Sequence, residues 1–375
     1  MLTPEELIRY SRHIRLDAVG QSGQETLKQA RVLVIGMGGL GSPVAFYLAA
    51  AGVGTLGLAD FDTIETHNLQ RQILHTDAGV GTAKLVSALE RLTALNPTIH
   101  YTPHPEAIHA DNAIALFEQY DLVIDGTDNF PTRYLVNDAA FFSGTPLVYG
   151  SIFQFEGQVS LFDAHNGGPC YRCLFPTMPA PDAVPNCEQA GVFGALCGVV
   201  GSYQAMEAIK YITGIGQSLK NRLLVIDSLR AQQRTLALKK DPDCPLCGRQ
   251  PSITCVAADN YSFNCQTEHP ANDTLMEITI DQLDHYPNPT FLDVREAFEV
   301  EICKIDNALH IPLSRLPQQY AHLPAAGPLV VYCHHGMRSL RATEFLHSVG
   351  KTNAVSLVGG IDAWAITKDP GMLRY

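Results

Sequence analysis

A short apolar segment followed by closely spaced glycines is the feature that most constrains the fold of this chain. Residues 31–36 (RVLVIG) read as a buried strand, and the glycines after them turn the chain into a helix expected over 42–51. A second apolar segment at 55–59 ends at Asp60. The pattern therefore predicts a strand–helix–strand unit that begins with a glycine-rich turn.

The same alternation continues along the first two thirds of the chain. A polar helix is expected at 110–119, and further strands are expected at 121–125 (DLVID) and 146–149. Alternating strands and helices indicate an α/β fold with a mostly parallel sheet and helices on both faces. We predict a Rossmann-like, doubly wound domain.

The alternation stops and then starts again near the C-terminus. Residues 248–274 have no clear period and are rich in polar and turn residues, so we expect a linker there. Strands are then expected at 291–295 and 328–333, with a helix from about Ser339. At 375 residues the chain is long enough for two domains, which we place at 1–247 and 275–375. The second is a smaller α/β domain.

Charge and hydropathy exclude several classes of protein. The net charge of −12 argues against a nucleic-acid-binding surface, which needs basic clusters. No apolar run approaches the roughly 18 residues of a membrane span. The first residues lack the apolar stretch of a signal peptide and instead predict a helix capped by Thr3 and Glu6. We therefore expect a cytoplasmic protein.

The glycines fit the G-x-G-x-x-G pattern of nucleotide-binding loops. Gly36, Gly38 and Gly41 would let the backbone approach a phosphate group at the start of a helix. Asp60 stands where a ribose-binding carboxylate would lie. Taken alone, this motif fits an NAD-dependent oxidoreductase about as well as an ATP-binding enzyme.

Charged and amide side chains further along favour a triphosphate. Arg71 and Lys84 near the glycine loop suit the charge of ATP better than that of a dinucleotide. Asp128 follows the strand at 121–125, where a carboxylate is well placed to hold Mg²⁺. The other polar residues of the predicted site lie between Asp60 and Lys84, and they are Asp62, Asn68 and Gln72.

Two C-x-x-C pairs predict a metal centre. Cys170 and Cys173 form one pair, and Cys244 and Cys247 form the other. Four thiolates can give the closed tetrahedral shell of a structural zinc ion, provided that the fold brings the two distant pairs together. A redox-active C-x-x-C is the alternative at this stage.

The remaining cysteines of the first two thirds have varied surroundings. Cys187 lies in a Pro-rich stretch that should be an exposed loop, so its thiol is a candidate nucleophile. Cys197 sits in an apolar helical run and is expected to pack in the core. Cys255 and Cys265 fall in the predicted linker, where nothing requires a disulfide between them, and Cys303 is expected to be an ordinary core or surface residue.

A cysteine near the C-terminus has the surroundings of a nucleophile. Cys333 follows a predicted strand and opens a loop that leads into a helix (CHHGMRS). Backbone N–H groups of such a loop, the helix N-terminus and Arg338 would stabilise a thiolate or persulfide. A tyrosine-phosphatase-like C-x5-R loop would place the arginine at 339, where this chain has serine. The loop length therefore favours sulfane sulfur over phosphate.

These motifs carry two family resemblances. The segment GMGGLGSPVAFYLAAAGVGTLGLADFD, then NLQRQ, Lys84 and DGTDN, resembles the MoeB/ThiF adenylyltransferases, relatives of ubiquitin-activating enzymes, over about residues 5–247. The segment from about 275 to 375, with LDVREAFE, the Cys333 loop and LVGGIDAW, looks like a rhodanese domain. The fusion of the two is similar to MoeZ-type and eukaryotic molybdopterin-synthase sulfurylase proteins.

The first resemblance implies specific roles for residues. It implies that the two C-x-x-C pairs bind zinc, that Cys187 attacks an acyl-adenylate, and that Arg12 reaches the ATP of a homodimer partner. Arg71 and Lys84 would stabilise phosphate charge, with Asp128 as a Mg²⁺ ligand. The residues implied to hold ATP are Gly39, Asp60, Asn68, Arg71, Lys84, Asp128 and Asn129.

Together the resemblances imply a two-step reaction. ATP would adenylate the Gly-Gly C-terminus of a ubiquitin-like sulfur-carrier protein, and a Cys333 persulfide would convert it to a thiocarboxylate. The sulfur donor would be thiosulfate or a cysteine desulfurase. Three alternatives stay open: a rhodanese domain that serves another acceptor, an NAD-dependent oxidoreductase with an accessory rhodanese domain, and a carrier-binding scaffold without catalysis.

Overall fold

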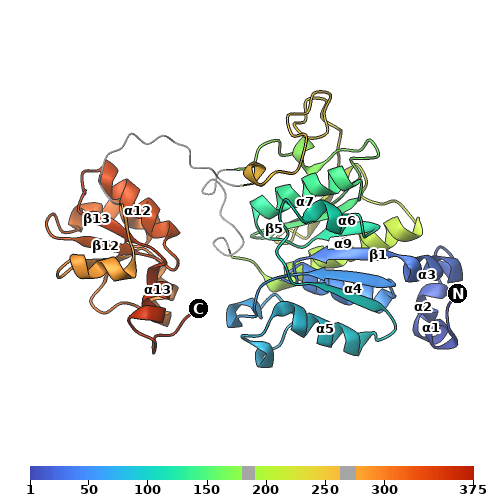
Figure 1. Cartoon of the computed structure of the whole chain (residues 1–375), viewed down its shortest axis with the longest axis horizontal. Coiled ribbons are helices and arrows are strands. Elements are labelled where there is room, and N and C mark those ends of the chain that lie inside the picture. Colours follow the sequence, from blue (N-terminus) through green and yellow to red (C-terminus); the bar gives the residue numbers. More distant parts are fainter. Residues whose placement is uncertain (180–190, 262–275) are drawn as a thin grey trace. The chain divides into compact units, whose positions relative to one another are not determined.

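The computed structural model describes residues 1–179, 191–261 and 276–375, which form two compact units (Figure 1). The units are Met1–Cys265 and Gln266–Tyr375. Each has its own sheet with buried apolar clusters on both faces. The predicted α/β class is confirmed for both units. Among the described residues, no helix combines the length and the apolarity that crossing a bilayer requires.

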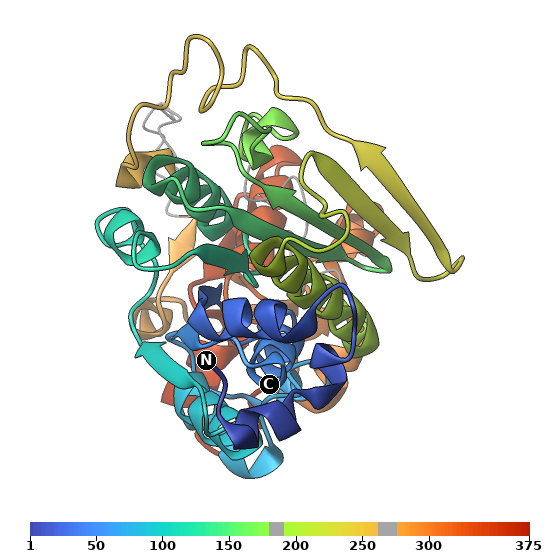
Figure 2. The same ribbon diagram turned by 90° about the vertical axis from the view of Figure 1, so that its right-hand side faces the viewer.

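The first unit is built on an eight-stranded sheet with the order β3-β2-β1-β4-β5-β6-β7-β8. The first five strands of this order are parallel and the last three are antiparallel. Figure 2 shows the β7–β8 hairpin at the outer edge of the sheet. The strands are β1 (Arg31–Ile35), β2 (Thr55–Ala59), β3 (His100–His104), β4 (Leu122–Asp125), β5 (Leu147–Phe153), β6 (Glu156–Phe162), β7 (Arg222–Asp227) and β8 (Gln232–Ala237).

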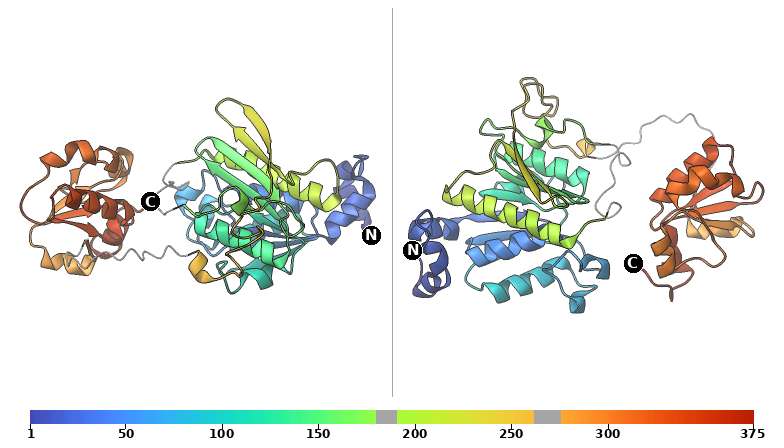
Figure 3. Two further views of the ribbon diagram at one scale, coloured as in Figure 1. Left: turned by 90° about the horizontal axis from the view of Figure 1, so that it is seen from above. Right: turned by 180° about the vertical axis from the view of Figure 1, so that it is seen from behind.

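Helices cover both faces of this sheet. Figure 1 shows α4 and α5 on one side of β1, and α6 and α7 on the other. Helix α9 packs beside α4, as Figure 3 shows from behind. The helices are α1 (Pro4–Arg9), α2 (Ser11–Ile14), α3 (Gly20–Gln29), α4 (Gly41–Ala51), α5 (Lys84–Leu95), α6 (Ala113–Phe117), α7 (Phe130–Ser143) and α9 (Gly194–Thr213).

Most predicted elements of this unit agree with the structure within one or two residues. The capping box of Thr3 and Glu6 is present, and β1, β2, α4 and β4 are confirmed. Helix α6 is shorter than the expected 110–119, and β5 extends beyond 149 to Phe153. The extension has a clear cause, since β5 pairs along its whole length with the antiparallel strand β6.

The second unit has a five-stranded parallel sheet with the order β11-β10-β12-β13-β9. The predicted strands at 291–295 and 328–333 correspond to β10 and β12, and the predicted helix begins at Met337. The strands are β9 (Glu277–Ile278), β10 (Thr290–Asp293), β11 (Leu309–His310), β12 (Leu329–Tyr332) and β13 (Ala354–Leu357). The helices are α10 (Ala297–Ile302), α11 (Leu316–Gln319), α12 (Met337–Ser348) and α13 (Gly360–Thr367).

The first half of the segment expected to be a linker packs on the first unit. Ile253 contacts the cluster of buried cysteines, and Tyr261 is buried among residues of the α7 face. The Tyr261 hydroxyl donates to the Asp138 carboxylate over 3.0 Å. Apolar side chains at irregular spacing make these contacts, which is why the sequence pattern gave no sign of them.

Candidate nucleotide pocket, cysteine centre and thiol loop

The glycine loop lies at the carboxyl edge of the first sheet, where β1, β2 and β4 end. Gly36 has a φ of +85°, and a Cβ at Gly41 would lie 1.7 Å from the Gly36 carbonyl oxygen. Only glycine allows this turn and this close approach. The register pairs Ile35 with both Ala59 and Asp125, so the segments that follow these three strands meet at one place.

The Asp60 carboxylate links the glycine loop to the segment that follows β2. Its carboxylate accepts hydrogen bonds from the backbone N–H of Met37 at 2.6 Å and of Asp62 at 2.8 Å. Burial raises the pKa of Asp60 against the opposing effect of the nearby Lys84. The predicted ribose-binding carboxylate therefore also supports the glycine loop.

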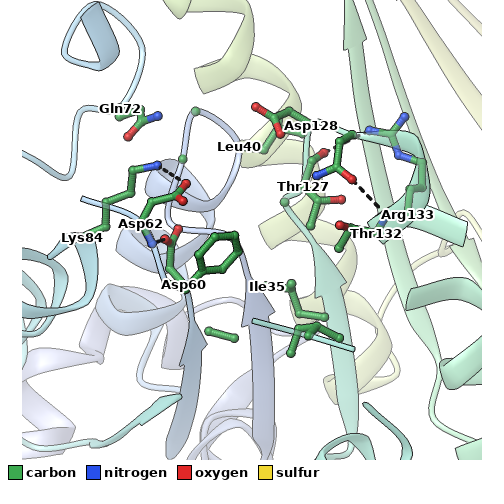
Figure 4. Close-up of a pocket in the computed structure, with 18 of the residues that line it drawn as sticks. Ile35, Leu40, Asp60, Asp62, Gln72, Lys84, Thr127, Asp128, Thr132 and Arg133 are labelled. Atoms are coloured by element: carbon green, nitrogen blue, oxygen red, sulfur yellow. Dashed lines mark hydrogen bonds and ion pairs between the residues drawn. The ribbon is translucent and has the colours of Figure 1, made fainter. Parts of the chain in front are cut away.

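A pocket opens between the glycine loop and the start of α7 (Figure 4). Lys84 lies on one side, where its Nζ is 2.9 Å from a carboxylate oxygen of Asp62. Figure 4 shows Asp128, Thr132 and Arg133 on the opposite side. Ten of the predicted site residues line the pocket: Gly36, Gly38, Gly39, Asp60, Asp62, Arg71, Gln72, Lys84, Asp128 and Asn129.

Three residues of the predicted nucleotide site do not line the pocket. Gly41 serves the close packing of α4 on the loop, as described above. Asn68 is buried in a turn, where its carbonyl accepts from the backbone N–H groups of Arg71 and Gln72, two residues that do line the pocket. Arg12 lies on α2 and is absent from the pocket lining of its own chain.

The Asp128 side of the pocket is shaped by a helix cap. Asn129 caps α7, and its side-chain oxygen accepts from the Thr132 N–H at 3.0 Å. Asp128 precedes the cap, and its side chain is exposed at the pocket. One accessible carboxylate beside a phosphate site suits Mg²⁺, which usually takes one or two carboxylates together with phosphate oxygens and water.

A buried ion pair that the sequence pattern does not predict lies behind this side of the pocket. The Arg133 Nε lies 3.5 Å from Asp125 Oδ2, and Nη2 donates to the Thr127 carbonyl at 3.0 Å. The other Asp125 oxygen accepts from the Thr127 N–H and hydroxyl. The sequence positions of the two residues could have indicated this pair, because Asp125 is the last residue of a buried strand and Arg133 is four residues after the helix cap.

The four cysteines of the C-x-x-C pairs come together in the first unit. Their sulfur atoms all lie within 4.8 Å of one another, and the recorded contacts between them are 3.5–3.9 Å. A tetrahedral zinc ion with Zn–S bonds of about 2.3 Å needs sulfur atoms about 3.8 Å apart. The residues present therefore fit zinc. Hydrogen bonds from Cys170 lower the pKa of Cys173 to about 7 and lower that of Cys244.

The cysteine centre is tied to α7. Arg172, between the first two cysteines, donates three hydrogen bonds of 2.8–3.1 Å to the buried Asp138 carboxylate of α7. The Tyr171 N–H donates to the Asn137 side chain at 2.8 Å. The same helix begins at the Asn129 cap, so one element spans from the cysteine centre to the pocket.

In the second unit, Cys333 lies at the end of β12 in a tight loop. Its thiol is buried, and Sγ accepts from the Gly336 N–H at 3.1 Å. Gly336 has a φ of +105°, which L side chains rarely adopt, and it caps α12. The Gly336 N–H therefore points at the sulfur atom beside the N-terminus of α12.

Arg338 of this loop is paired with a carboxylate. Its two terminal nitrogens each donate to Glu299 of α10 at 2.7 Å. Burial raises the pKa of Glu299, but the hydrogen bonds and charge of Arg338, the Glu296 N–H and the Tyr375 hydroxyl together lower it to about 2. The charge of Arg338 is thus balanced within the unit.

Tyr375 completes the surroundings of the loop. Its hydroxyl donates to Glu299 at 2.9 Å and accepts from Arg295 at 2.8 Å, and its ring stacks on His334 with centroids 4.2 Å apart. Burial, followed by the adjacent His335, lowers the pKa of His334 to about 4. The imidazole is therefore neutral at physiological pH.

The remaining cysteines have different positions. Cys197 is buried on α9, as expected, and also lines the nucleotide pocket. Cys255 is exposed and Cys303 is half-buried. The candidate nucleophile Cys187 and the linker residue Cys265 lie outside the described residues.

Comparison with known proteins gives two family matches. The ThiF family model matches residues 10–246, and the rhodanese-like domain model matches residues 279–367. The chain is 45% identical to the probable adenylyltransferase/sulfurtransferase MoeZ of Mycobacterium tuberculosis, over 100% of this chain and 96% of that protein. It is 39% identical to the adenylyltransferase and sulfurtransferase MOCS3 of Mus musculus, over 100% and 88%.

Two further matches concern the first unit. The sulfur carrier protein adenylyltransferase of Thermus thermophilus is 52% identical, over 67% of this chain and 94% of that protein. Among solved structures, E. coli MccB matches with a TM-score of 0.57 at 23% identity, over 66% of this chain and 75% of that chain. At this identity the structural match supports the fold alone.

Proposed function

The chain belongs to the ThiF family and carries a rhodanese-like domain behind the ThiF domain, and from this premise we propose its reaction. The chain uses ATP to adenylate the C-terminus of a ubiquitin-like sulfur-carrier protein and then transfers sulfur to that C-terminus. It is thus an adenylyltransferase and a sulfurtransferase, the two activities named in relatives that match its whole length. The resemblance inferred from the sequence is confirmed.

One observation carries the adenylation step. The pocket combines a glycine loop and two cations, Arg71 and Lys84, with the carboxylate of Asp128 on its far side. In this step a carboxylate oxygen of the carrier attacks the α-phosphorus of ATP, the bond to the bridging oxygen breaks, and pyrophosphate leaves. Such a reaction needs reactants held in line and charge stabilised on phosphate oxygens. We propose that Lys84 and Arg71 supply that charge.

Metal ions complete the proposed site. Asp128 would hold Mg²⁺, which supplies charge neutralisation to the phosphate groups when bound. The four cysteines would hold a structural zinc ion. We also propose that the chain acts in the cytoplasm, where reducing conditions prevent disulfide bonds from forming at these cysteines and at Cys333.

Cys333 carries the sulfur in the second step. The terminal sulfur of a Cys333 persulfide attacks the acyl carbon of the adenylate, and AMP leaves. Two thiol groups of a reductant then cleave the S–S bond of the resulting acyl disulfide. The first forms a mixed disulfide with Cys333 and releases the carrier thiocarboxylate, and the second forms a disulfide with the first and restores the Cys333 thiol. The Gly336 N–H, which points at Sγ, would stabilise the Cys333 thiolate when Sγ leaves the S–S bond.

Several finer assignments belong to the same proposal. The carrier ends in Gly-Gly, the sulfur donor is thiosulfate or a cysteine desulfurase, and the chain acts as a homodimer in which Arg12 reaches the partner's ATP. If Cys187 attacks the adenylate first, AMP leaves at that point, the carrier is held as a Cys187 thioester, and the Cys333 persulfide attacks this thioester in place of the adenylate. These assignments rest on the family resemblance, and the roles of Arg12 and Cys187 can be tested by substitution of these two residues.

The decisive experiment measures both steps on one carrier. Full-length protein is incubated with a Gly-Gly carrier, MgATP, thiosulfate and dithiothreitol, and the carrier is weighed by mass spectrometry. We expect a mass gain equal to the difference between sulfur and oxygen, together with carrier-dependent ATP–pyrophosphate exchange. Exchange without the mass gain would mean that the rhodanese domain serves another acceptor, and the absence of both would overturn the proposal.

A further inference from the structure

His75 is a buried residue that the proposed chemistry does not use, although it contacts the glycine loop. It lies in the segment between β2 and α5, after the pocket residues Arg71 and Gln72, and it is only 6% exposed. Its Nε2 is 2.9 Å from the Met37 carbonyl oxygen, and its Nδ1 is 3.1 Å from the Ser87 hydroxyl. A buried imidazole with two hydrogen bonds has a fixed ring orientation.

The partners of the ring determine its tautomer. A carbonyl oxygen can only accept a hydrogen bond, so the His75 Nε2 carries the hydrogen and donates it to Met37. In the neutral ring Nδ1 then accepts from the Ser87 hydroxyl, which can rotate to donate. Burial lowers the pKa of His75, in keeping with a neutral ring.

His75 and Asp60 together fix both sides of Met37 in the glycine loop. Asp60 accepts from the Met37 N–H at 2.6 Å, while His75 donates to the carbonyl of the same residue. That carbonyl shares a planar trans peptide with the Gly38 N–H, and the two groups point in opposite directions. A carbonyl held toward His75 therefore directs the Gly38 N–H away from His75.

The direction of the Gly38 N–H matters for anion binding. Gly38 lines the pocket, and within the described residues its N–H has no hydrogen-bond partner. Backbone N–H groups of a glycine loop at a helix N-terminus are the groups that bind phosphate oxygens. Because this N–H is oriented before ATP binds, binding does not have to supply the free energy of ordering the loop.

The second contact of His75 reaches the helix that carries Lys84. Ser87 lies three residues after Lys84 on α5, and both are buried. The pair of hydrogen bonds made by His75 thus connects the glycine loop to the helix that brings a cation into the same pocket.

We propose that His75 is a positioning residue for nucleotide binding. It holds the Gly38 N–H and Lys84 at the relative positions in which both can contact the phosphate groups of ATP. The inference rests on the proposed ATP-dependent function. It adds to that function a residue that touches neither substrate nor metal.

Asparagine and glutamine substitutions separate the two hydrogen bonds. An asparagine amide reaches about as far as Nδ1, so His75→Asn keeps a partner for Ser87 and loses the donor to Met37. A glutamine amide reaches about as far as Nε2, so His75→Gln keeps that donor. His347→Asn is the control, because His347 also donates to a backbone carbonyl at 2.8 Å but lies in the second unit.

Binding of MgATP to the full chain is measured by calorimetry, and KM values for ATP and carrier are measured by exchange. We expect about tenfold weaker ATP binding and a similar rise in the KM for ATP for His75→Asn and His75→Ala. His75→Gln should stay within about twofold of the wild type, with the carrier KM unchanged in all variants.

Three results would overturn the inference. These are wild-type ATP binding by His75→Asn, ATP binding by His75→Gln as weak as that of His75→Ala, and an equal weakening of ATP binding by the control His347→Asn. Absence of MgATP binding by the wild-type chain would instead overturn the proposed function.

Discussion

At the scale of single residues, the positively charged side chain of Lys84 is held in place at the pocket. Its side chain is 7% exposed, and its ammonium group is held by the half-exposed Asp62. A buried cation with one fixed partner is oriented before the nucleotide arrives, so its attraction to a phosphate group is little weakened by reorganisation. Loss of the charge should therefore affect the rate of adenylation more than the stability of the fold.

We expect Lys84→Met to lower kcat for carrier-dependent ATP–pyrophosphate exchange by about 100-fold or more, the usual effect of removing one preorganised charge-stabilising group. Asp62→Asn, which keeps the cation but weakens its orientation, should lower the rate by about tenfold or less. Initial rates at saturating ATP test both. An effect of Asp62→Asn as large as that of Lys84→Met would contradict the proposal that Lys84 stabilises the charge on the phosphate groups.

Glu299 gives a residue-scale prediction about acid stability. Burial raises its pKa in the folded protein, but the hydrogen bonds and charge of Arg338 and the hydrogen bonds from Glu296 and Tyr375 together lower it to about 2, whereas an unfolded glutamate has its ordinary value of 4.5. The pair therefore stabilises the fold fully above that ordinary value, and the stabilisation is lost as the pH falls toward 2. Glu299→Gln should reduce the difference in urea midpoint between pH 6 and pH 3.

The fluorescence of the single tryptophan reports this transition. Trp364 lies in α13 and packs on Phe291, so its signal follows the second unit alone. Glu301→Gln is the matched control, since Glu301 is an exposed carboxylate of the same helix. Equal pH dependence in Glu299→Gln and the wild type would show that the Arg338 pair does not stabilise this unit.

At the scale of elements, α7 joins the cysteine centre to the nucleotide pocket. Its middle holds Arg172 through Asp138, and its first turn carries Arg133 beside the Asn129 cap. Metal-bound cysteines would fix the position of Arg172, and hence of α7. The cysteine centre should therefore matter for stability first, and for adenylation through the placement of this helix.

Removal of a cysteine ligand tests this coupling. We expect wild-type protein to contain one zinc ion per chain by elemental analysis, and Cys244→Ser to lose it together with several kcal/mol of stability in the first unit. Cys255→Ser is the control, because Cys255 is an exposed thiol of the same unit. Full stability of Cys244→Ser, or of wild-type protein after dialysis against a chelator, would contradict a structural metal at this place.

The elements also show which parts of the molecule the sequence could predict. The spacing of Gly36, Gly38 and Gly41 is local, and so the turn and its flanking strands and helix could be predicted. Most residues of the predicted nucleotide site line one pocket. The Arg133–Asp125 pair joins α7 to β4, and Tyr375 contacts Glu299 from 76 residues away. Periodicity carries no information on such contacts, because they depend on how the elements pack together.

At the scale of the whole molecule, the chain combines two units with separate cores and separate chemical groups. The pocket belongs entirely to the first unit, and the Cys333 loop and its partners Glu299 and Tyr375 belong to the second. The two half-reactions should therefore be separable by single substitutions, although the complete reaction needs both units.

Two substitutions in the full chain test this separation. Cys333→Ala should leave carrier-dependent ATP–pyrophosphate exchange within about twofold of the wild type, because its volume change is small and lies in the other core. The same variant should form no thiocarboxylate. Asp128→Ala should show the reverse pattern, with loss of exchange but normal formation of the Cys333 persulfide from thiosulfate, detected by mass spectrometry of the intact protein. If Cys333→Ala lost exchange while its melting curve stayed normal, adenylation would depend directly on the thiol, and the order of steps proposed for this chain would be wrong.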